Sequence, residues 1–256
     1  MSDFTLEAFT DLYLAAFDQP EPIPGLSAEK ERYTAPAVIE KLWTVADRLI
    51  DNAKKFNLTS ILDPAEIVRK HILDSLIPLG LLREAGYSFD SLLDMGTGAG
   101  FPLLPMACAM ADEDVTFTGL DATAKKISHI LETASACCLP SVSAVSGRAE
   151  ERARGDLREA FGCVTARAVA ELPVLCELCA PFVRVGGFFC AMKSHVDGEL
   201  EPAKSAAKKL GLGNARRIDY LLPGGDARCL VIFPKISAAP LKFPRRYADI
   251  KKQPLK

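Results

Sequence analysis

The sequence predicts an α/β fold, with a mostly parallel, doubly wound sheet of about seven strands, an antiparallel edge and a helical region in front of it. Three observations support this fold class. After Ser88, short apolar runs alternate with stretches of helical periodicity, as in a parallel sheet covered by helices. The first apolar run leads directly into a glycine-rich loop. The last two runs are joined by a short Pro-Gly-Gly turn, which favours an antiparallel pair.

Residues 1–88 form the predicted N-terminal helical region. Apolar residues recur there at helical spacing, and the Pro-rich segment 19–25 separates two helices. A helix is expected to begin at Asp63-Pro-Ala-Glu66. This stretch combines a capping carboxylate, a Pro at the first helical position and a Glu three residues after the cap.

Residues 89–256 contain the predicted sheet and end in a basic tail. The clearest helices between the strands are 124–139 and 172–183. The carboxyl ends of parallel strands meet at one edge of the sheet, so residues that follow different strands can share one crevice. The expected strands are 91–94, 115–121, 142–146, 163–166, 187–192, 217–222 and 229–234.

Composition indicates a globular protein without a general attraction for nucleic acid. Hydrophobic residues make up 49% of the chain, charged residues 25%, and the formal net charge is −2. Residues 242–256 differ, because six cations and one anion lie there. This tail is either simply solvated or a phosphate-binding edge, in which Arg245, Arg246, Lys251 and Lys252 would make the contacts.

Neither a membrane span nor a signal peptide is expected, because charge, Gly or Pro cuts every apolar run well short of about 20 residues. A cytoplasmic location follows. The eight cysteines lie mostly in apolar segments and are interpreted as buried small hydrophobes. Cys176-Glu-Leu-Cys179 has the spacing of a metal knuckle, but no second matching pair exists, so no metal is expected.

The glycine loop Asp94-Met-Gly-Thr-Gly-Ala-Gly100 excludes two common phosphate-binding motifs. The P-loop pattern is absent, and the dinucleotide fingerprint fails because its third glycine would fall at Phe101 or Leu103. What remains is a carboxylate followed by three alternating glycines. Such bare backbone suits a ligand with an amino-acid moiety and a ribose but no pyrophosphate.

Residues after the next two strands also indicate a nucleoside ligand. Asp121 ends the second strand, where carboxylates hold ribose hydroxyls. The third strand runs into Gly147-Arg-Ala-Glu150, a turn that lies along the base in such folds. The amide of Ala149 or Glu150 would read the base there, although the Glu150 carboxylate is equally consistent with a helix cap.

The glycine loop resembles the S-adenosylmethionine (SAM) loop of class I methyltransferases. The resemblance implies their Rossmann-like fold and SAM as the cofactor. It also implies that Asp94 helps to place the methionine amino group, directly or through water, and that Gly96, Gly98 and Gly100 give the ligand room.

The methyl acceptor is narrowed by signatures that the sequence lacks. Residues 165–169, Thr-Ala-Arg-Ala-Val, replace the motif that serves exocyclic amines, and no Pro-Cys pair supplies the thiolate needed for pyrimidine C5. An acceptor with a free lone pair, such as guanine N7, needs neither device, because positioning supplies much of its rate. Arg167 and Lys193 follow the fourth and fifth strands. They are either solvated cations or partners of an anionic substrate or the SAM carboxylate.

From about Asn57 onward the chain is similar to the bacterial small-subunit (16S) rRNA guanine-N7 methyltransferases, also called glucose-inhibited division protein B. Two positions depart from that family's usual pattern: Leu103 replaces a Gly, and Ala122-Thr123 stands where a Ser commonly follows the carboxylate. The matching segments are Asn57-Leu-Thr59, 71–75, 93–102, Leu120-Asp121 with Lys125-Lys126, 148–151, 166–168, 191–193, 222–224 with Arg228, and 243–245.

This resemblance implies methylation of N7 of guanine 527 in the 530 loop of 16S rRNA. The RNA is either naked or part of a small-subunit precursor, and a monomeric enzyme is expected. Arg167 and Lys193 would position the reactants without a general base, and His71 and Asp74 would pack or touch RNA. The alternatives are another RNA or a small molecule as acceptor, a SAM-binding RNA chaperone, and a nicotinamide dehydrogenase, which the broken fingerprint disfavours. The implied cofactor contacts are Gly96, Phe101, Ala149, Glu150 and Arg167.

Overall fold

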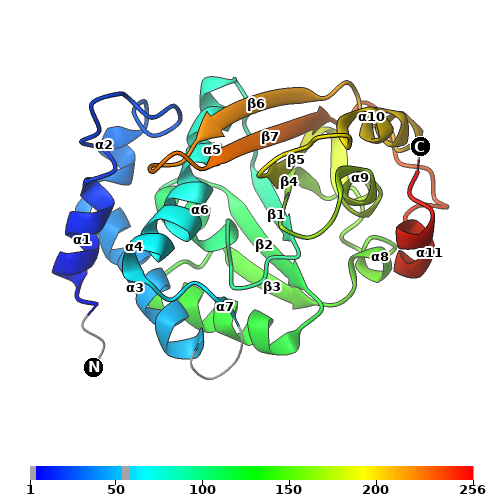
Figure 1. Ribbon diagram of the computed structural model, residues 1–256. Coiled ribbons are helices and arrows are strands. Elements are labelled where there is room, and N and C mark those ends of the chain that lie inside the picture. Colours follow the sequence, from blue (N-terminus) through cyan, green and yellow to red (C-terminus); the bar gives the residue numbers. More distant parts are fainter. Residues whose placement is uncertain (1–3, 54–57, 256) are drawn as a thin grey trace.

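The structure, a computed structural model, describes residues 4–53 and 58–255. Asn57 of the Asn57-Leu-Thr59 motif and Lys256 of the tail lie outside the described residues. A seven-stranded sheet in the order β3-β2-β1-β4-β5-β7-β6 runs through the molecule, with helices on both faces (Figure 1). The strands are β1 (Ser91–Met95), β2 (Thr116–Asp121), β3 (Val142–Ser146), β4 (Phe161–Arg167), β5 (Val183–Lys193), β6 (Arg216–Leu221) and β7 (Ala227–Pro234).

The predicted fold class and all seven predicted strands are confirmed. Strands β1 to β5 are parallel, and β7 runs antiparallel to both β5 and β6. Strand β5 begins earlier than expected, because Val183 already pairs with Phe161 before a register shift in the ladder. The helix predicted over 124–139 ends at Ala136, and Cys138 then takes a left-handed backbone with φ 52°.

The helices pack in two layers. One layer holds the N-terminal helices together with α6 and α7, and the other holds α8 to α11 (Figure 1). The helices are α1 (Leu6–Leu14), α2 (Lys30–Tyr33), α3 (Pro36–Ala53), α4 (Pro64–Ile67), a π-helix (Val68–Leu73), α5 (Asp74–Glu84), α6 (Leu103–Ala109), α7 (Ala124–Ala136), α8 (Ala149–Arg152), α9 (Leu172–Cys179), α10 (Leu200–Lys209) and α11 (Tyr247–Lys252).

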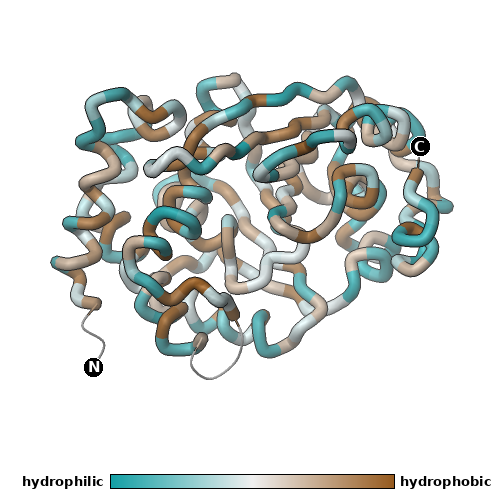
Figure 2. The backbone as a smooth tube through the Cα atoms, in the orientation of Figure 1, coloured by the Kyte–Doolittle hydropathy of each residue, from teal (hydrophilic) through white to brown (hydrophobic). Residues whose placement is uncertain are grey.

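Neighbouring residues on each strand enter different hydrophobic cores. Leu92 and Phe188 point into the core beneath the N-terminal helices, whereas Leu93 and Phe189 point into the core beneath α9 and α10. This is the two-residue alternation of a strand that is buried on both faces. Hydrophobic segments accordingly concentrate in the sheet and in the helices that face it (Figure 2). Strand order reverses between β1 and β4, where a doubly wound sheet binds its ligand.

The N-terminal helices share a core with the sheet, because one hydrophobic cluster extends from Phe4 on to Ile232. Buried tyrosines bind these helices to one another: the Tyr13 hydroxyl donates to Tyr33 O (3.2 Å) and the Tyr33 hydroxyl donates to Leu76 O (3.2 Å). Burial raises the pKa of Tyr33, so its hydroxyl remains a donor.

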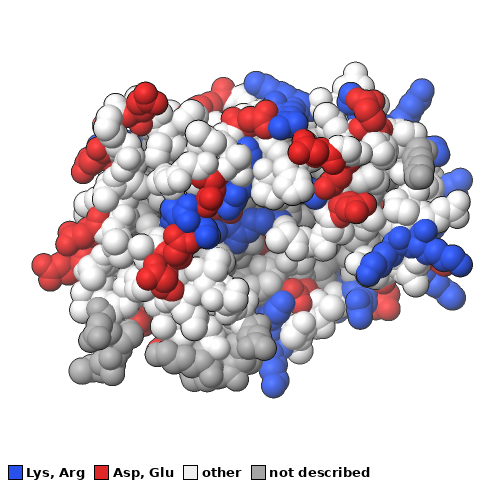
Figure 3. Space-filling view, in the orientation of Figure 1, with Lys and Arg blue, Asp and Glu red and all other residues white. Residues whose placement is uncertain are grey.

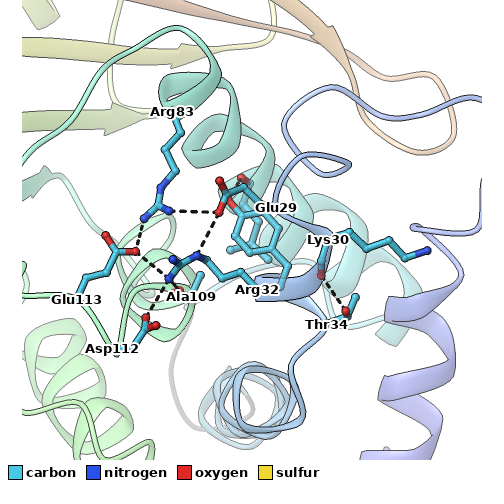
Figure 4. Close-up of polar contacts among 10 residues, drawn as sticks. Glu29, Lys30, Arg32, Thr34, Arg83, Ala109, Asp112 and Glu113 are labelled. Carbon is cyan, nitrogen blue, oxygen red and sulfur yellow. Dashed lines mark hydrogen bonds and ion pairs between the residues drawn. The ribbon is translucent and has the colours of Figure 1, made fainter.

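An ion-pair network ties α2 and α5 to the loop that follows α6 (Figure 4). Arg32 lies 2.8 Å from Glu113 and 3.2 Å from Glu29, and Arg83 pairs with the same two carboxylates. Each guanidinium bridges two carboxylates, so the four charges hold one another in place. Such networks contribute more than isolated surface pairs do.

The helix that begins at Asp63 contains a π-helical stretch that periodicity did not predict. The Asp63 carboxylate caps the helix as expected and accepts the Glu66 amide at 2.9 Å. Over Val68–Leu73 the backbone then widens into a π-helix. Such insertions change which face the following side chains occupy and are frequent at functional sites. Here the stretch brings Lys70, His71 and Asp74 to the carboxyl edge of the sheet.

Leu103, the departure from the resembled pattern, is accommodated by a glycine on β2. Leu103 is fully buried, and a Cβ on Gly119 would come within 3.0 Å of its Cδ2 atom. The missing side chain of Gly119 therefore makes room for Leu103.

No helix among the described residues is long and apolar enough to cross a membrane. The described part of the chain also holds no group of three or more His, Cys, Asp or Glu side chains that could bind a metal ion. Seven of the eight cysteines are buried and Cys138 is exposed.

Candidate active site

Asp94 lies at the carboxyl end of β1 and is buried, with one free oxygen. Its Oδ1 atom accepts a hydrogen bond from the Thr165 hydroxyl of β4 (2.9 Å). No group meets hydrogen-bond geometry at its Oδ2 atom, while Thr97 and the Leu103 backbone are near enough to lower the pKa of the carboxyl. Thr97 Oγ1, in the glycine loop, is likewise buried without a partner. Burial raises the pKa of Asp94 from 3.8 to about 6. The carboxylate is therefore costly to ionise without a cationic ligand.

Neighbouring side chains of the protein occupy part of the space that the glycines of the loop leave free. Gly96 has φ +74°, and a Cβ there would come within 2.6 Å of Val169 Cγ2. Gly98 has φ +59°, and its missing side chain would face open space. A Cβ on Gly100 would collide with Leu104. Besides any room for a ligand, two of the three glycines thus leave room for neighbouring side chains.

Asp121 closes the loop from the end of β2. Its Oδ2 atom accepts the Gly98 amide (3.1 Å) and its Oδ1 atom accepts the Thr123 amide (2.8 Å). Lys126 lies 3.8 Å from the same carboxylate. The side chain is thereby fixed at the edge of the sheet, with lone pairs left for ligand hydroxyls.

The first cavity lies over the carboxyl ends of β1, β2 and β3 and measures about 210 Å³. Four of the residues predicted to bind cofactor line it: Gly96, Asp121, Ala149 and Glu150. No side chain caps α8, so the Glu150 carboxylate does not act as its N-cap. The other lining residues are Met95, Leu120, Ala122, Gly147, Arg148, Val169, Leu178 and Tyr247.

The second cavity measures about 380 Å³ and is bounded by β4, β5, the π-helical stretch and the β6–β7 hairpin. Figure 3 shows Lys and Arg side chains in the hollow between α4 and this hairpin, and another group of them over α11. The cavity is lined by Ile61, Lys70, His71, Asp74, Arg167, Ala168, Ala170, Met192, Lys193, Ser194, Tyr220 and Arg228.

Asp74 organises the cations of the second cavity. Its Oδ2 atom lies 3.2 Å from Arg167 Nη1, and its Oδ1 atom lies 3.3 Å from Arg228 Nε and accepts the Tyr220 hydroxyl at 3.3 Å. Arg167 also donates to Lys70 O (3.3 Å). Burial raises the pKa of Asp74, while the two guanidiniums act in the opposite sense.

Lys193 is held by a residue that sequence reasoning did not single out. Its Nζ atom lies 2.9 Å from Glu199 Oε2 and donates to Ala170 O (3.2 Å). The same Glu199 oxygen accepts the Leu172 amide at the start of α9 (2.6 Å), where a carboxylate is favoured by the helix dipole. Arg167 and Lys193, expected to be neighbours, do line one cavity.

Phe101 and His71 form the wall behind Arg167. Their rings stack with centroids 4.7 Å apart, and the Arg167 guanidinium lies 5.8 Å from the Phe101 centroid. His71 Nε2 bonds to Thr59 Oγ1 (3.0 Å), whereas Nδ1 is buried without a partner. Burial, with Arg167 nearby, lowers the pKa of His71 to about 4, so the imidazole is neutral at physiological pH.

Segment 168–170 separates the two cavities. Ala168 and Ala170 line the second cavity, while Val169 between them lines the first. Ala168 has φ +56°, a left-handed conformation that residues with a Cβ rarely adopt and that occurs preferentially at functional sites. A group carried by a ligand in the first cavity thus needs to pass only this thin partition to reach the second.

The predicted RNA-binding tail is only partly exposed. Arg246, Lys251 and Lys252 point to solvent, as expected of a basic surface. The Arg245 guanidinium, in contrast, pairs with the buried Glu177 carboxylate at 2.6 Å. Arg245 is therefore engaged inside the protein.

The first cavity fits SAM. Asp121 lines it where ribose hydroxyls bind, and the 147–150 turn borders the position of the base. Asp94 is not part of the lining, but it lies two residues before the lining residue Gly96, and its Oδ2 atom offers an acceptor for an ammonium group. When bound, SAM supplies a methyl group carried on a positively charged sulfur. Together the fold and this loop define a class I SAM-dependent methyltransferase.

Comparisons with known proteins narrow this class to a family. The family model described as rRNA small subunit methyltransferase G (GidB) matches residues 38–216. A ribosomal RNA small subunit methyltransferase G of Lactobacillus delbrueckii is 38% identical over 224 residues, covering 86% of this chain and 93% of its own. Its counterpart in Lachnoclostridium phytofermentans is 39% identical over 221 residues, covering 85% and 89%. The chain therefore belongs to the rRNA small subunit methyltransferase G family.

Solved structures agree on the fold. An O-methyltransferase from Bacillus cereus, in complex with S-adenosylhomocysteine (SAH), superimposes with a TM-score of 0.54 at 15% identity, covering 90% of this chain and 100% of its own. A putative O-methyltransferase from Klebsiella pneumoniae gives 0.50 at 16% identity, covering 74% and 90%. At such identities the likeness extends to the fold alone.

Asp94→Asn tests the carboxylate at the cofactor site. Because folding raises the Asp94 pKa from 3.8 to about 6, its stabilising contribution is complete below pH 3.8 and is lost as pH rises through 6. Asn stays neutral, so at pH 8 the ligand-free variant should be more stable than wild type by on the order of 2 kcal/mol. Its affinity for SAH, measured by calorimetry, should fall at least about tenfold.

Asp156→Asn, which alters an exposed carboxylate before β4, should change neither quantity. Unchanged SAH affinity in Asp94→Asn would remove Asp94 from the cofactor site.

Proposed function

We propose that this enzyme transfers a methyl group from SAM to N7 of guanine 527 in the 530 loop of 16S rRNA. Family membership makes small-subunit rRNA the substrate. The observation that carries the finer assignment is the second cavity, which is rich in cations and next to the cofactor cavity, yet offers no base suited to neutral pH among its described residues. We assign this activity to a monomer, since one chain supplies both cavities. We also propose that the enzyme acts in the cytoplasm.

The described titratable residues of the second cavity are unsuited to proton abstraction near neutral pH. Asp74 is paired with two guanidiniums. His71 is half-buried and stacked on Phe101, and its lowered pKa of about 4 makes it a weak base. Lys193 is paired with Glu199, and arginine does not release its proton in the usable pH range. Guanine N7 carries no proton, so an acceptor of this kind requires no base.

The cationic side chains of the second cavity bind and position the target nucleotide and transfer no proton. Arg167 presents a planar guanidinium that is fixed by Asp74, Lys70 O and the Phe101 face. Such a group can donate to guanine O6 or to a phosphate oxygen. Lys193 and Arg228 add positive charge to the same cavity. Holding the purine in a near-attack position is then the main contribution of these residues to the rate.

The basic surface on α11 suits the rest of the RNA. Arg246, Lys251 and Lys252 are exposed, and they lie on the segment that also borders the cofactor cavity. We assign phosphate contacts to these three residues. Arg245 contributes through its internal ion pair with Glu177 instead.

Mapping of N7-methylguanine tests the assignment directly. Small subunits from cells that lack this protein should gain one N7-methylguanine, at position 527, when incubated with the purified enzyme and SAM. Chemical cleavage at N7-methylated guanines locates the modification, and naked 16S rRNA assayed in parallel identifies the preferred substrate. Methylation at a different nucleotide would refute the assignment of the site while leaving the enzyme class intact.

The pH dependence of single-turnover methylation tests the absence of a general base. With SAM saturating, the rate should be nearly constant between about pH 6.5 and 8.5, because the acceptor loses no proton. His71→Gln should slow the reaction by disturbing the Phe101–Arg167 wall, but the profile should keep its shape. An ionisation near neutrality that disappears in His71→Gln would overturn this mechanism.

The tail is tested by the salt dependence of RNA binding. Neutralising Arg246, Lys251 and Lys252 together should reduce the slope of log K against log[salt] by roughly 2, at about 0.7 per single-strand contact. The probe is a 16S rRNA fragment that contains the 530 loop. Lys30→Gln, which removes an exposed cation near the N-terminus, should leave the slope unchanged. An unaltered slope in the triple variant would make the tail a solvated surface only.

A further inference from the structure

The C-terminal segment is docked against the cofactor domain along its length. Phe243 and Ile250 are buried in the core beneath α9. Arg158 donates to the carbonyls of Phe243 (3.0 Å) and Ala239 (2.7 Å), and Arg154 donates to Pro244 O (2.8 Å). These contacts fix the chain just before α11.

The strongest of these attachments is a buried ion pair. Glu177, in the middle of α9, is fully buried, and its Oε1 atom accepts both the backbone N–H and the Nε–H of Arg245 at 2.9 Å. Its Oε2 atom accepts Nη2–H at 2.6 Å, and the same nitrogen donates to Gln253 O (3.0 Å). A carboxylate so far from water needs a full partner, so Arg245 is bound firmly and spans both ends of α11.

This attachment sets α11 beside the first cavity. Leu178, the neighbour of Glu177 on α9, lines the cavity, and so does Tyr247 at the first position of α11. Among the described residues of the lining, Tyr247 supplies the one aromatic ring. It shares the cavity with Ala149 and Glu150, which follow β3.

We propose that Tyr247 forms the outer wall of the subsite for the purine base of SAM, and that the Glu177–Arg245 ion pair holds it there. The inference rests on SAM as the cofactor. Asp121 fixes the ribose position at the end of β2, so the base extends toward the turn after β3, where Tyr247 lies. A flat ring next to a purine contributes roughly 1–3 kcal/mol of stacking, and more of the base is withdrawn from water.

The wall also brings the RNA-facing surface next to the cofactor. Arg246 adjoins Tyr247 in the chain, and Lys251 and Lys252 end the same short helix. Any movement of α11 on contact with RNA therefore changes the wall of the base subsite.

Comparing the binding of two ligands distinguishes effects on the base subsite from effects on the amino-acid subsite. SAH carries base, ribose and amino acid, whereas 5′-methylthioadenosine carries base and ribose only. Tyr247→Ala should weaken the binding of both ligands by a similar factor, on the order of tenfold by calorimetry. Asp94→Asn should weaken the binding of SAH alone. Tyr247→Phe, which keeps the ring, and Asp156→Asn, which alters an exposed carboxylate with no assigned role, should bind both ligands like wild type.

Two further variants guard against a general loss of structure. Tyr247→Leu fills the position without a flat ring and should lose part of the affinity at an unchanged melting temperature. Glu177→Gln should weaken both ligands and accelerate hydrogen exchange in residues 246–253.

Wild-type affinity for both ligands in Tyr247→Ala, or a loss for SAH without a loss for 5′-methylthioadenosine, would overturn the proposal. In either case, a loss of SAH affinity in Asp94→Asn would still support the assignment of SAM as the cofactor.

Discussion

The acceptor side of the site depends on one buried carboxylate. Asp74 lies almost out of water, and removing a partner from a buried charge typically costs about 3–5 kcal/mol. Its three partners come from separate parts of the fold: Arg167 from the end of β4, and Tyr220 and Arg228 from the β6–β7 hairpin. The need to satisfy this charge therefore draws the N-terminal helices, the middle of the sheet and its antiparallel edge to one point. The second cavity forms around that point.

Charge is divided between the two cavities along one edge of the sheet. Asp94 is the second-last residue of β1 and Asp121 the last of β2, whereas β4 and β5 end in Arg167 and Lys193. The strand order reverses between β1 and β4, so the acidic and basic ends lie on opposite sides of the switch point. A cationic ammonium group is favoured on the first side and a polyanionic RNA on the second. Only segment 168–170 lies between them.

Both ends of the chain take part in the site. The N-terminal region supplies Lys70, His71 and Asp74 to the second cavity and is fixed to the sheet by the network of Arg32, Arg83, Glu29 and Glu113. The C-terminal segment borders the cofactor cavity and is fixed by Glu177. The two ends of the chain thus pack in different hydrophobic cores, on opposite faces of one sheet, and each borders one of the two cavities.

The sequence by itself determined what depends on local order: the seven strands, the antiparallel edge, the cap at Asp63, the glycine loop and the carboxylates after β1 and β2. These follow from periodicity, turn chemistry and strand-end position, which act over a few residues. Tertiary structure alone decided which charges meet. Periodicity did not predict the π-helix that turns His71 and Asp74 toward the sheet, because it depends on packing. Glu177 stands inside an apolar helix, 68 residues from Arg245, and Glu199 accepts the amide of Leu172, 27 residues away. Tyr247 stands in a tail that reads simply as basic. Their partners are selected by burial, since a charge removed from water must find its counter-ion wherever the folded chain places one.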